Sequence, residues 1–489
     1  MRAEPRGSAL GRPGRRAALT RVCLLTAPLA TCGALLLRAP SQSGVRAFAL
    51  IVALCAAAVV VAGEWAPRCL TVRSVVVAGL VPVAVAVALA PQGSRDLWGY
   101  AAYGRVLVTY HESPYVHPPS EHAGDPVIGR MPAVWQHTRA PYGPAFLAVA
   151  GVPSAAGVRS ALATRLWFQG LAGVAALLGL LLLARAGASP GRLAVFALNP
   201  LLAVFIVNGG HNDLLVGVPV LAAAAAVGGR RWVLAGVALG LAATVKVVAL
   251  LPLVVLVAWV WRRHGRPAWT VAGTAGGVAL GALVLAGGTA AVAPLGAEAA
   301  QQSRASLWGA ISTWVLRSPR WFSGSSPAAG GLVHHWVPYS LAACAVAAVV
   351  LAGGARFGPA TLVSLGLLAY LLAAPYVLPW YMGWLLPLLP LVEASAPDET
   401  VRIHSPLPTG ELTVAVGAGY GAMLLLVYTD RAGYGGPGHL VLHTLGWLMA
   451  PLLELAALGA LCAVLVRTHR DERRAEAVRS GLPWTKRRP

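Results

Sequence analysis

Long, nearly uncharged apolar runs recur along most of this chain, and they limit its fold more than any other feature. The hydrocarbon core of a bilayer is about 30 Å thick and needs roughly 20 apolar residues per spanning helix. We therefore expect an all-α polytopic membrane protein with about 14 transmembrane helices, within a range of 12–15. The runs lie near residues 18–37, 47–63, 74–90, 160–184, 192–207, 213–228, 232–246, 247–261, 269–291, 334–353, 360–376, 379–394, 412–429 and 441–466.

The composition supports this class and excludes several others. Of the 489 residues, 57% are hydrophobic and 11% are charged, whereas a soluble domain carries about 25% charged residues. Disordered chains lack so many apolar residues. The six cysteines form no CxxC pair, so the sequence predicts neither a disulfide framework nor a zinc site. No Gly-rich phosphate-binding motif stands in a strand–helix context, so we expect no cytosolic nucleotide-binding domain.

The basic residues indicate how the chain is oriented. Its 38 Lys and Arg exceed its 17 Asp and Glu, giving a formal net charge of +21. Cytoplasmic loops are enriched in Lys and Arg, so we interpret the excess as a topology signal and expect no nucleic-acid partner. We expect a plasma-membrane protein with a basic cytoplasmic N-terminus (1–17), a transmembrane domain (18–466) and a basic cytoplasmic tail (467–489). Two long loops, 91–144 and 292–333, then lie on the outer face.

Acidic residues are scarce, and one of them begins the first outer loop. Asp96 directly follows a predicted span and precedes aromatic residues and Arg105, in a segment whose spacing predicts an amphipathic helix on the membrane surface. A carboxylate can accept a proton from a sugar hydroxyl, aromatic faces stack on sugar rings, and Arg can hold a phosphate. The same pattern fits an acid that caps a helix beside an interfacial aromatic belt. Both interpretations stay open.

A second polar cluster reads NGGHND, from Asn208 to Asp213, and lies between two predicted spans on the same outer side. Its glycines permit a tight turn that brings His211 and Asp213 together, although an ordinary polar hairpin has the same sequence pattern. Lys246 follows within an apolar stretch. A lysine inside a membrane is costly, so we expect an anionic partner, with snorkelling to the interface as the alternative.

The remaining polar features are weaker. The segment YVLPWYMGW, residues 376–384, combines prolines with aromatic rings at the outer face, and the second outer loop adds Arg304. The first outer loop holds four histidines whose spacing matches no metal-binding template such as HExxH, so we expect no metal. These histidines are His111, His117, His122 and His137.

Taken together, these pieces resemble one known family. The ordered set contains SRD with aromatic residues after a span, an SPY turn, an APYGP turn, NGGHND, a lysine-bearing helix and YVLPWY. It looks like the actinobacterial polyprenol-phosphate-mannose-dependent α-(1→6)-mannosyltransferases, which belong to the GT-C superfamily of polytopic glycosyltransferases. The likeness is best over residues 90–255. It departs from the family at Leu97-Trp98-Gly99-Tyr100 and at His111-Glu112-Ser113, which leaves the donor sugar and the acceptor open.

The resemblance implies an inverting, metal-independent mannosyl transfer without a cofactor. A polyprenyl-phosphate-mannose would be the donor, and a mannan, glycolipid or lipoglycan in the bilayer would accept the sugar through an α-(1→6) linkage at the outer face. Asp96 matches the catalytic acid of the first outer loop and would deprotonate the acceptor hydroxyl. The expected phosphate-binding residues are Arg105, His211, Lys246 and Arg304. The expected sugar-binding or acceptor-binding residues are Tyr100, Tyr142, Asp213, Trp380 and Tyr381.

Three alternatives remain from the sequence. The same fold could use a polyprenyl-phosphate arabinose or glucose, or it could glycosylate a protein. A lipid-linked sugar flippase or transporter is also polytopic, with broken helices and isolated charges. Glu454, near the middle of the last predicted span, is the best argument for transport.

Overall fold

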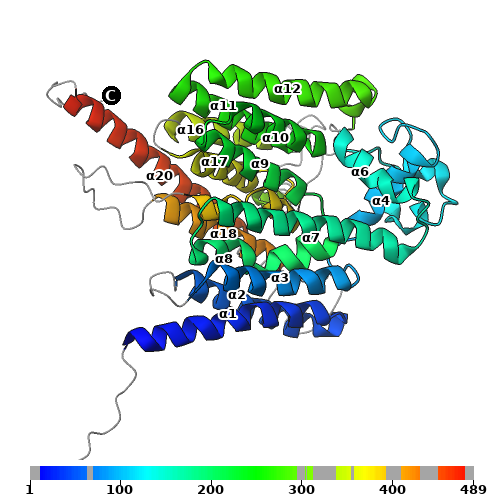
Figure 1. Cartoon of the computed structure of the whole chain (residues 1–489), viewed down its shortest axis with the longest axis horizontal. Helices are drawn as coiled ribbons and strands as arrows, with labels where there is room; N and C mark the ends of the chain where they lie inside the picture. The colour runs from blue at the N-terminus through cyan, green and yellow to red at the C-terminus, as the bar shows by residue number, and fades with distance from the viewer. Residues whose placement is uncertain are drawn as a thin grey trace, which may run out of the picture.

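The computed structural model is all-helical wherever it has regular secondary structure. It describes residues 12–62, 70–294, 303, 305–311, 337–353, 357–392, 409–429 and 450–479. Most helices lie side by side in a bundle, with α1 (Arg12–Leu36) at one edge and α12 (Pro267–Leu285) at the opposite edge (Figure 1). The described part of the chain therefore confirms the predicted all-α class.

Seven helices in the described ranges are long and apolar enough to cross a membrane. They are Arg15–Leu36, Ser43–Ala62, Ala161–Arg185, Pro190–Val207, Val247–His264, Pro267–Leu285 and Gly410–Thr429. Other apolar helices, such as Val72–Ala88 and Leu214–Gly228, are shorter. The expected count of fourteen is not confirmed.

The helices pack in two connected groups. In the first, α1 packs on α2 and α3, and α3 packs on α7 and α8. In the second, α10 packs between α9 and α12, while α17 contacts α9, α11, α16 and α20. These helices are α2 (Ser43–Ala62), α3 (Val72–Ala88), α7 (Ala161–Arg185), α8 (Pro190–Ala197), α9 (Leu214–Gly228), α10 (Trp232–Val245), α11 (Leu250–His264), α16 (Val337–Gly353), α17 (Pro359–Ala373), α18 (Thr409–Thr429) and α20 (Ala450–Arg479).

The segment after α3 folds into a separate cap at one end of the bundle. It contains α4 (Asp96–Val108) and α6 (Pro144–Ala155), which pack against each other. Between them lie the short turns η3 (Pro119–His122), η4 (Ile128–Arg130) and α5 (Ala133–Gln136). In Figure 1 this cap lies at the right, whereas α1 begins and α20 ends toward the left.

Helix α4 is present where the sequence predicts it, but its surroundings differ from the prediction. Leu97 and every residue from Gly99 to Val106 are buried within the protein. A helix enclosed on nearly all sides cannot lie on a membrane surface with one polar face. The expected amphipathic surface helix is therefore wrong, because α6 and the following turns cover the face that was expected to meet water.

Two breaks shorten the helices that line the middle of the bundle. After α8 the chain forms a π-helical turn, η5 (Leu202–Val207), and then a turn through residues 210–213 before α9 begins. Between α10 and α11, Lys246 has an extended backbone with φ −155° and ψ 135°. Both breaks bring polar residues of the sequence clusters to the same end of the bundle.

The predicted span 379–394 is wrong as a continuous helix. Its described residues form two 3-10 turns, η10 (Pro379–Trp384) and η11 (Leu389–Leu391). Pro379, Pro387 and Pro390 lack the backbone N–H that an α-helix needs. The apolar composition of this segment matches its burial among the helices.

Glu454 has a structural explanation. Its side chain is buried in α20, where one carboxylate oxygen accepts a hydrogen bond from the Leu307 backbone N–H at 2.5 Å. The other oxygen accepts from the Tyr420 hydroxyl at 3.1 Å. Leu307 begins the short helix α14 (Leu307–Ile311), whose first N–H groups have no partner within the helix. Glu454 therefore connects α14, which lies within the segment 292–333, to the helix bundle.

Candidate active site

Side-chain hydrogen bonds hold the end of α3 and thereby position the residues that follow it. The last carbonyls of a helix have no partner within the helix. In α3 these carbonyls accept bonds from the Asn208 amide, the Gln169 amide and the Arg165 guanidinium. The Asn208 side-chain oxygen in turn accepts from the Gln92 backbone N–H at 3.0 Å. The short connection from α3 to Asp96 is thus fixed to two other helical segments.

A cavity of about 690 Å³ opens beside the start of α4. Its lining residues come mainly from the segment 91–144, from the break at Lys246 and from the segment around η10. Six of the residues expected from the sequence line it together: Asp96, Tyr100, Tyr142, Lys246, Trp380 and Tyr381. The structure therefore brings three sequence clusters, separated by up to 285 positions, into one place.

Asp96 is the first residue of α4, and its backbone N–H donates to the Ser94 hydroxyl at 3.0 Å. The N-cap position belongs to Arg95. The Asp96 side chain keeps 28% of its surface exposed and lines the cavity. Its Oδ2 lies 3.8 Å from Nδ1 of His211, which is too long for a direct hydrogen bond. The carboxylate is accordingly accessible to a molecule in the cavity.

His211 lies behind the cavity wall and has no exposed side-chain surface. Its ring stacks on Trp380, with centroids 3.9 Å apart and planes 12° apart, and its Nδ1 is 3.2 Å from the Tyr100 hydroxyl. Burial, and next the charge of Lys246, hold the pKa of His211 well below its usual value. A neutral buried ring cannot supply a cation to a phosphate, so the structure favours a role in positioning Trp380 and Tyr100.

Lys246 has the anionic partner that its place in the sequence predicts. Its Nζ lies 3.1 Å from Oδ1 of Asp213, which is fully buried, while Lys246 keeps 16% of its side chain exposed to the cavity. Aromatic rings surround the ammonium, with centroids 4.6 Å away at Tyr381, 5.2 Å at Trp384 and 5.9 Å at Tyr142. The lysine therefore turns into the protein and does not snorkel away.

Two close backbone contacts produce this arrangement. The Gly143 N–H donates to the Val245 carbonyl at 2.9 Å, and a Cβ at Gly143 would lie only 2.2 Å from the Thr244 carbonyl oxygen. A Cβ at Gly217 would lie 2.0 Å from the Gly383 carbonyl oxygen. Glycine at these positions lets the APYGP turn meet the end of α10 and lets η10 meet α9. Tyr142 and Tyr381 reach Lys246 as a result.

Comparison with known proteins identifies the group to which this site belongs. The family model described as alpha-(1->6)-mannopyranosyltransferase, N-terminal domain, matches residues 20–263, which include Asp96 and Lys246. The chain belongs to this family. The family is one of glycosyltransferases, in agreement with the resemblance in the sequence motifs.

One curated relative of this mannosyltransferase family matches part of the chain. Alpha-(1->6)-mannopyranosyltransferase A of Mycobacterium tuberculosis (strain ATCC 25618 / H37Rv) is 33% identical over 209 residues, which are 40% of this chain. The matched region spans 38% of the relative's length. No solved structure matches the chain.

Arg105 and His211, two of the expected phosphate ligands, do not line the cavity of this mannosyltransferase family member. Arg105 pairs with buried Asp125, whose Oδ2 lies 2.7 Å from Nε and 2.7 Å from Nη2 of the arginine. These residues line a second cavity of about 440 Å³, together with Tyr110, His122, Gly124, Pro126 and Arg159. Arg304 lies outside the described residues. Asp213, expected to contact sugar, is buried beneath Lys246 and does not line the cavity.

Other cavity residues of this family member were missed by the sequence reasoning. Arg38 and Arg95 line the cavity, so its charged lining residues are two arginines, Lys246 and a single acid, Asp96. The Arg95 guanidinium donates to the Arg130 carbonyl at 2.9 Å, whereas the described residues offer Arg38 no ion-pair partner. Arg38 directly follows the first apolar run. An arginine at the end of a predicted span, on the side where the acid-containing loop 91–144 is expected, is the signal that could have found it. An excess of cations suits an anionic ligand.

Proposed function

We propose that this protein transfers mannose from a polyprenyl-phosphate-mannose to a mannan or glycolipid acceptor and forms an α-(1→6) linkage. The observation that carries the proposal is the accessible Asp96 carboxylate in a cavity lined by aromatic rings and three cations. Family membership supplies the reaction class.

The proposed reaction is a single displacement. Asp96 accepts the proton of the acceptor hydroxyl, whose oxygen forms a bond to the anomeric carbon of the donor. The bond from that carbon to the phosphate oxygen breaks, and the electron pair leaves with the polyprenyl phosphate. Attack from the side opposite the phosphate inverts a β-linked donor into an α-linked product. Proton removal of this kind contributes about 10²–10⁴-fold to the rate.

Lys246 and Arg38 are our proposed partners for the donor phosphate. Charge grows on the phosphate as it leaves, and fixed cations stabilise that charge in the transition state. Lys246 is held in place by Asp213 and the surrounding rings, and it still faces the cavity. Arg38 lines the same cavity at the end of α1. These cations supply the needed charge, so the proposed transfer itself uses no metal.

The aromatic residues supply surfaces for sugars. Trp380 is fixed by its stack on His211, and Tyr381 stacks on Trp384 with centroids 4.4 Å apart. Tyr142 lies between Tyr100 and Lys246. Rings that are already packed lose little conformational entropy when a sugar binds. We assign Trp380, Tyr381 and Tyr142 to sugar contacts.

We place this site on the outer face of a GT-C-type membrane protein with both termini in the cytoplasm. Basic loops support that orientation, and the cap that holds the cavity lies opposite the start of α1 and the end of α20 (Figure 1). A lipid-linked donor can approach such a site from the bilayer. Glu454, which favoured a transporter, is engaged with Leu307 and Tyr420, so that alternative loses its main support.

The test compares Asp96→Asn with Glu411→Gln in membranes that contain equal amounts of protein. Glu411 is an exposed acid in α18 and does not line the cavity. Asp96→Asn should lower mannosyl transfer from labelled polyprenyl-phosphate-mannose by about 10²–10⁴-fold, with wild-type rates for Glu411→Gln. Full activity of Asp96→Asn would contradict the mechanism. Parallel assays with the arabinose and glucose donors, and linkage analysis of the product, decide the donor and the bond formed.

A further inference from the structure

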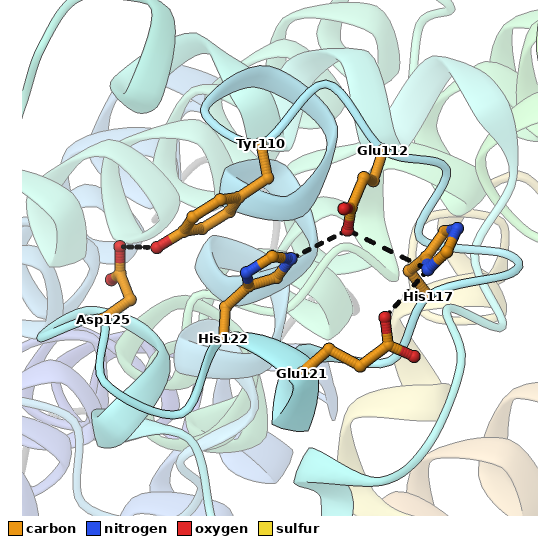
Figure 2. Close-up of polar contacts among 6 residues, drawn as sticks. All are labelled: Tyr110, Glu112, His117, Glu121, His122 and Asp125. Atoms are coloured by element: carbon orange, nitrogen blue, oxygen red, sulfur yellow. Dashed lines mark hydrogen bonds and ion pairs between the residues drawn. The ribbon is translucent and has the colours of Figure 1, made fainter.

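A cluster of histidines and glutamates lies in the cap, away from the cavity that holds Asp96. Figure 2 shows Glu112, His117, Glu121 and His122 converging from one stretch of loop. The Nδ1 atom of His117 lies 2.8 Å from Oε2 of Glu121 and 4.0 Å from Oε2 of Glu112. None of the four residues lines the larger cavity. The proposed transfer reaction leaves this cluster without a role.

The fold assembles this cluster through two local features. His111 has a positive φ of 56°, which turns the chain sharply just before Glu112. The turn η3 then carries Glu121, four positions after His117. Donor atoms of Glu112, His117 and Glu121 all lie within 4.8 Å of one another. The short separations in sequence do not match a known metal template, so only the folded loop reveals the grouping.

We propose that Glu112, His117 and Glu121 bind a divalent metal ion of the zinc type. One imidazole nitrogen and two carboxylates are donors that Zn²⁺ accepts, and water completes a tetrahedral set of four. Bond lengths of about 2.0–2.1 Å place tetrahedral donors about 3.3 Å apart. The 2.8 Å and 4.0 Å separations from His117 lie on either side of that value. Small side-chain rotations therefore suffice to bind the ion.

The neighbouring residues hold one ligand in place. Nε2 of His122 lies 2.8 Å from Oε2 of Glu112, and the His122 ring stacks on Tyr110 with centroids 3.6 Å apart. The Tyr110 hydroxyl donates to Oδ2 of Asp125 at 3.1 Å (Figure 2). Asp125 also pairs with Arg105. Ligating carboxylates commonly receive such supporting hydrogen bonds. His122 is thus a positioning residue that connects the metal site to α4.

The site is accessible to ions from solution. The three ligand side chains are between 34% and 48% exposed. A bound ion would join the two ends of the loop between Glu112 and Glu121 and would restrict its opening. We therefore expect metal binding to protect this loop from proteolysis without contributing a group to the cavity.

The experiment measures zinc binding to the purified full-length protein in detergent after treatment with EDTA. Equilibrium dialysis against buffered ZnCl₂, with metal analysis by mass spectrometry, should give saturable binding of about one ion per chain. His117→Gln and Glu121→Gln should each abolish that binding, and His122→Asn should weaken it about 10–100-fold. The matched control is His137→Ala, an exposed histidine of the same outer loop outside the cluster. Zinc should also slow protease cleavage in the wild type and in this control, but not in His117→Gln.

Equal zinc binding by the wild type and by both ligand variants would overturn the proposal, as would the absence of saturable binding in the wild type. Circular dichroism and gel filtration identify any variant that fails to fold, and the isosteric Glu121→Gln change keeps the test decisive if His117→Gln does not fold. Binding is measured without donor or acceptor, so the outcome is independent of the transfer assay.

Discussion

Nζ of Lys246 lies 3.1 Å from Oδ1 of fully buried Asp213, and this pair joins the break between α10 and α11 to the start of α9. Removing one member of a buried ion pair leaves an uncompensated charge, which commonly costs about 3–5 kcal/mol. The pair therefore contributes to the architecture of the site as well as to its charge.

We expect Lys246→Met to lower the thermal stability of the protein strongly, because Asp213 would then remain buried without its cation. Asp213→Asn combined with Lys246→Met removes both charges and should recover much of the loss. Thermal unfolding in detergent measures both effects. A double variant no more stable than Lys246→Met would contradict the importance of the pair.

The pKa of His211 predicts an acid-sensitive contribution to stability. Burial lowers the pKa of this ring below its usual value of 6.5, so the unfolded chain takes up the proton at a higher pH than the folded protein. The contribution of the neutral His211 ring to the stability of the folded protein is fully present above about pH 6.5 and is lost as the pH falls. The difference in melting temperature between wild type and His211→Gln should shrink between about pH 7.5 and pH 5.5. An unchanged difference across that range would contradict the assignment.

Arg38→Gln should weaken use of the lipid donor. Losing a hydrogen bond to a charged group costs about 1.5–3 kcal/mol, which corresponds to about 10–100-fold in kcat/KM for the polyprenyl-phosphate-mannose. The control is Arg159→Gln, an exposed arginine of the second cavity. Steady-state assays with the donor varied test this, and similar kinetics for the two variants would remove Arg38 from the phosphate site.

Glu454→Ala should affect stability and not the transfer chemistry. The change leaves the Leu307 N–H without its buried acceptor, at a cost of about 1–3 kcal/mol for the unsatisfied group. The Tyr420 hydroxyl loses its bond to Glu454 but keeps the Leu371 carbonyl as an acceptor at 3.1 Å. Melting temperature should fall, while activity per folded molecule stays close to that of the wild type. Loss of activity without loss of stability would instead indicate a direct role for this acid.

The sequence predicts one of these relationships because burying an unpaired charge in an apolar environment has a high free-energy cost. A lysine in an apolar stretch requires a partner, and Lys246 has one in Asp213. Asp96 lines a cavity together with aromatic residues that follow it in the sequence, such as Tyr100 and Tyr142. For Lys246, a single energetic argument applied to one residue leads to the correct partner.

Other relationships depend on tertiary packing that local patterns do not carry. The sequence indicates Arg105 as a phosphate ligand, but in the structure it pairs with Asp125, twenty positions away. Glu454 meets Leu307 across 147 positions. Periodicity also predicts an exposed face for α4, but α6 and the turns around it enclose the helix. The segment 379–394 is as apolar as a spanning helix, but its prolines prevent a continuous α-helix.

The hydrogen bonds around the end of α3 have a consequence for changing specificity. They fix the connection that leads to Asp96 to Asn208, Gln169 and Arg165. Other residues that line the cavity, such as Met131 and Trp135, belong to the loop between α4 and α6 and take no part in these bonds. Substitutions in that loop can reshape the space for an acceptor without breaking the bonds that position the carboxylate. We expect libraries confined to residues 131–138 to yield new acceptor preferences more often than libraries directed at Gln169 and Asn208.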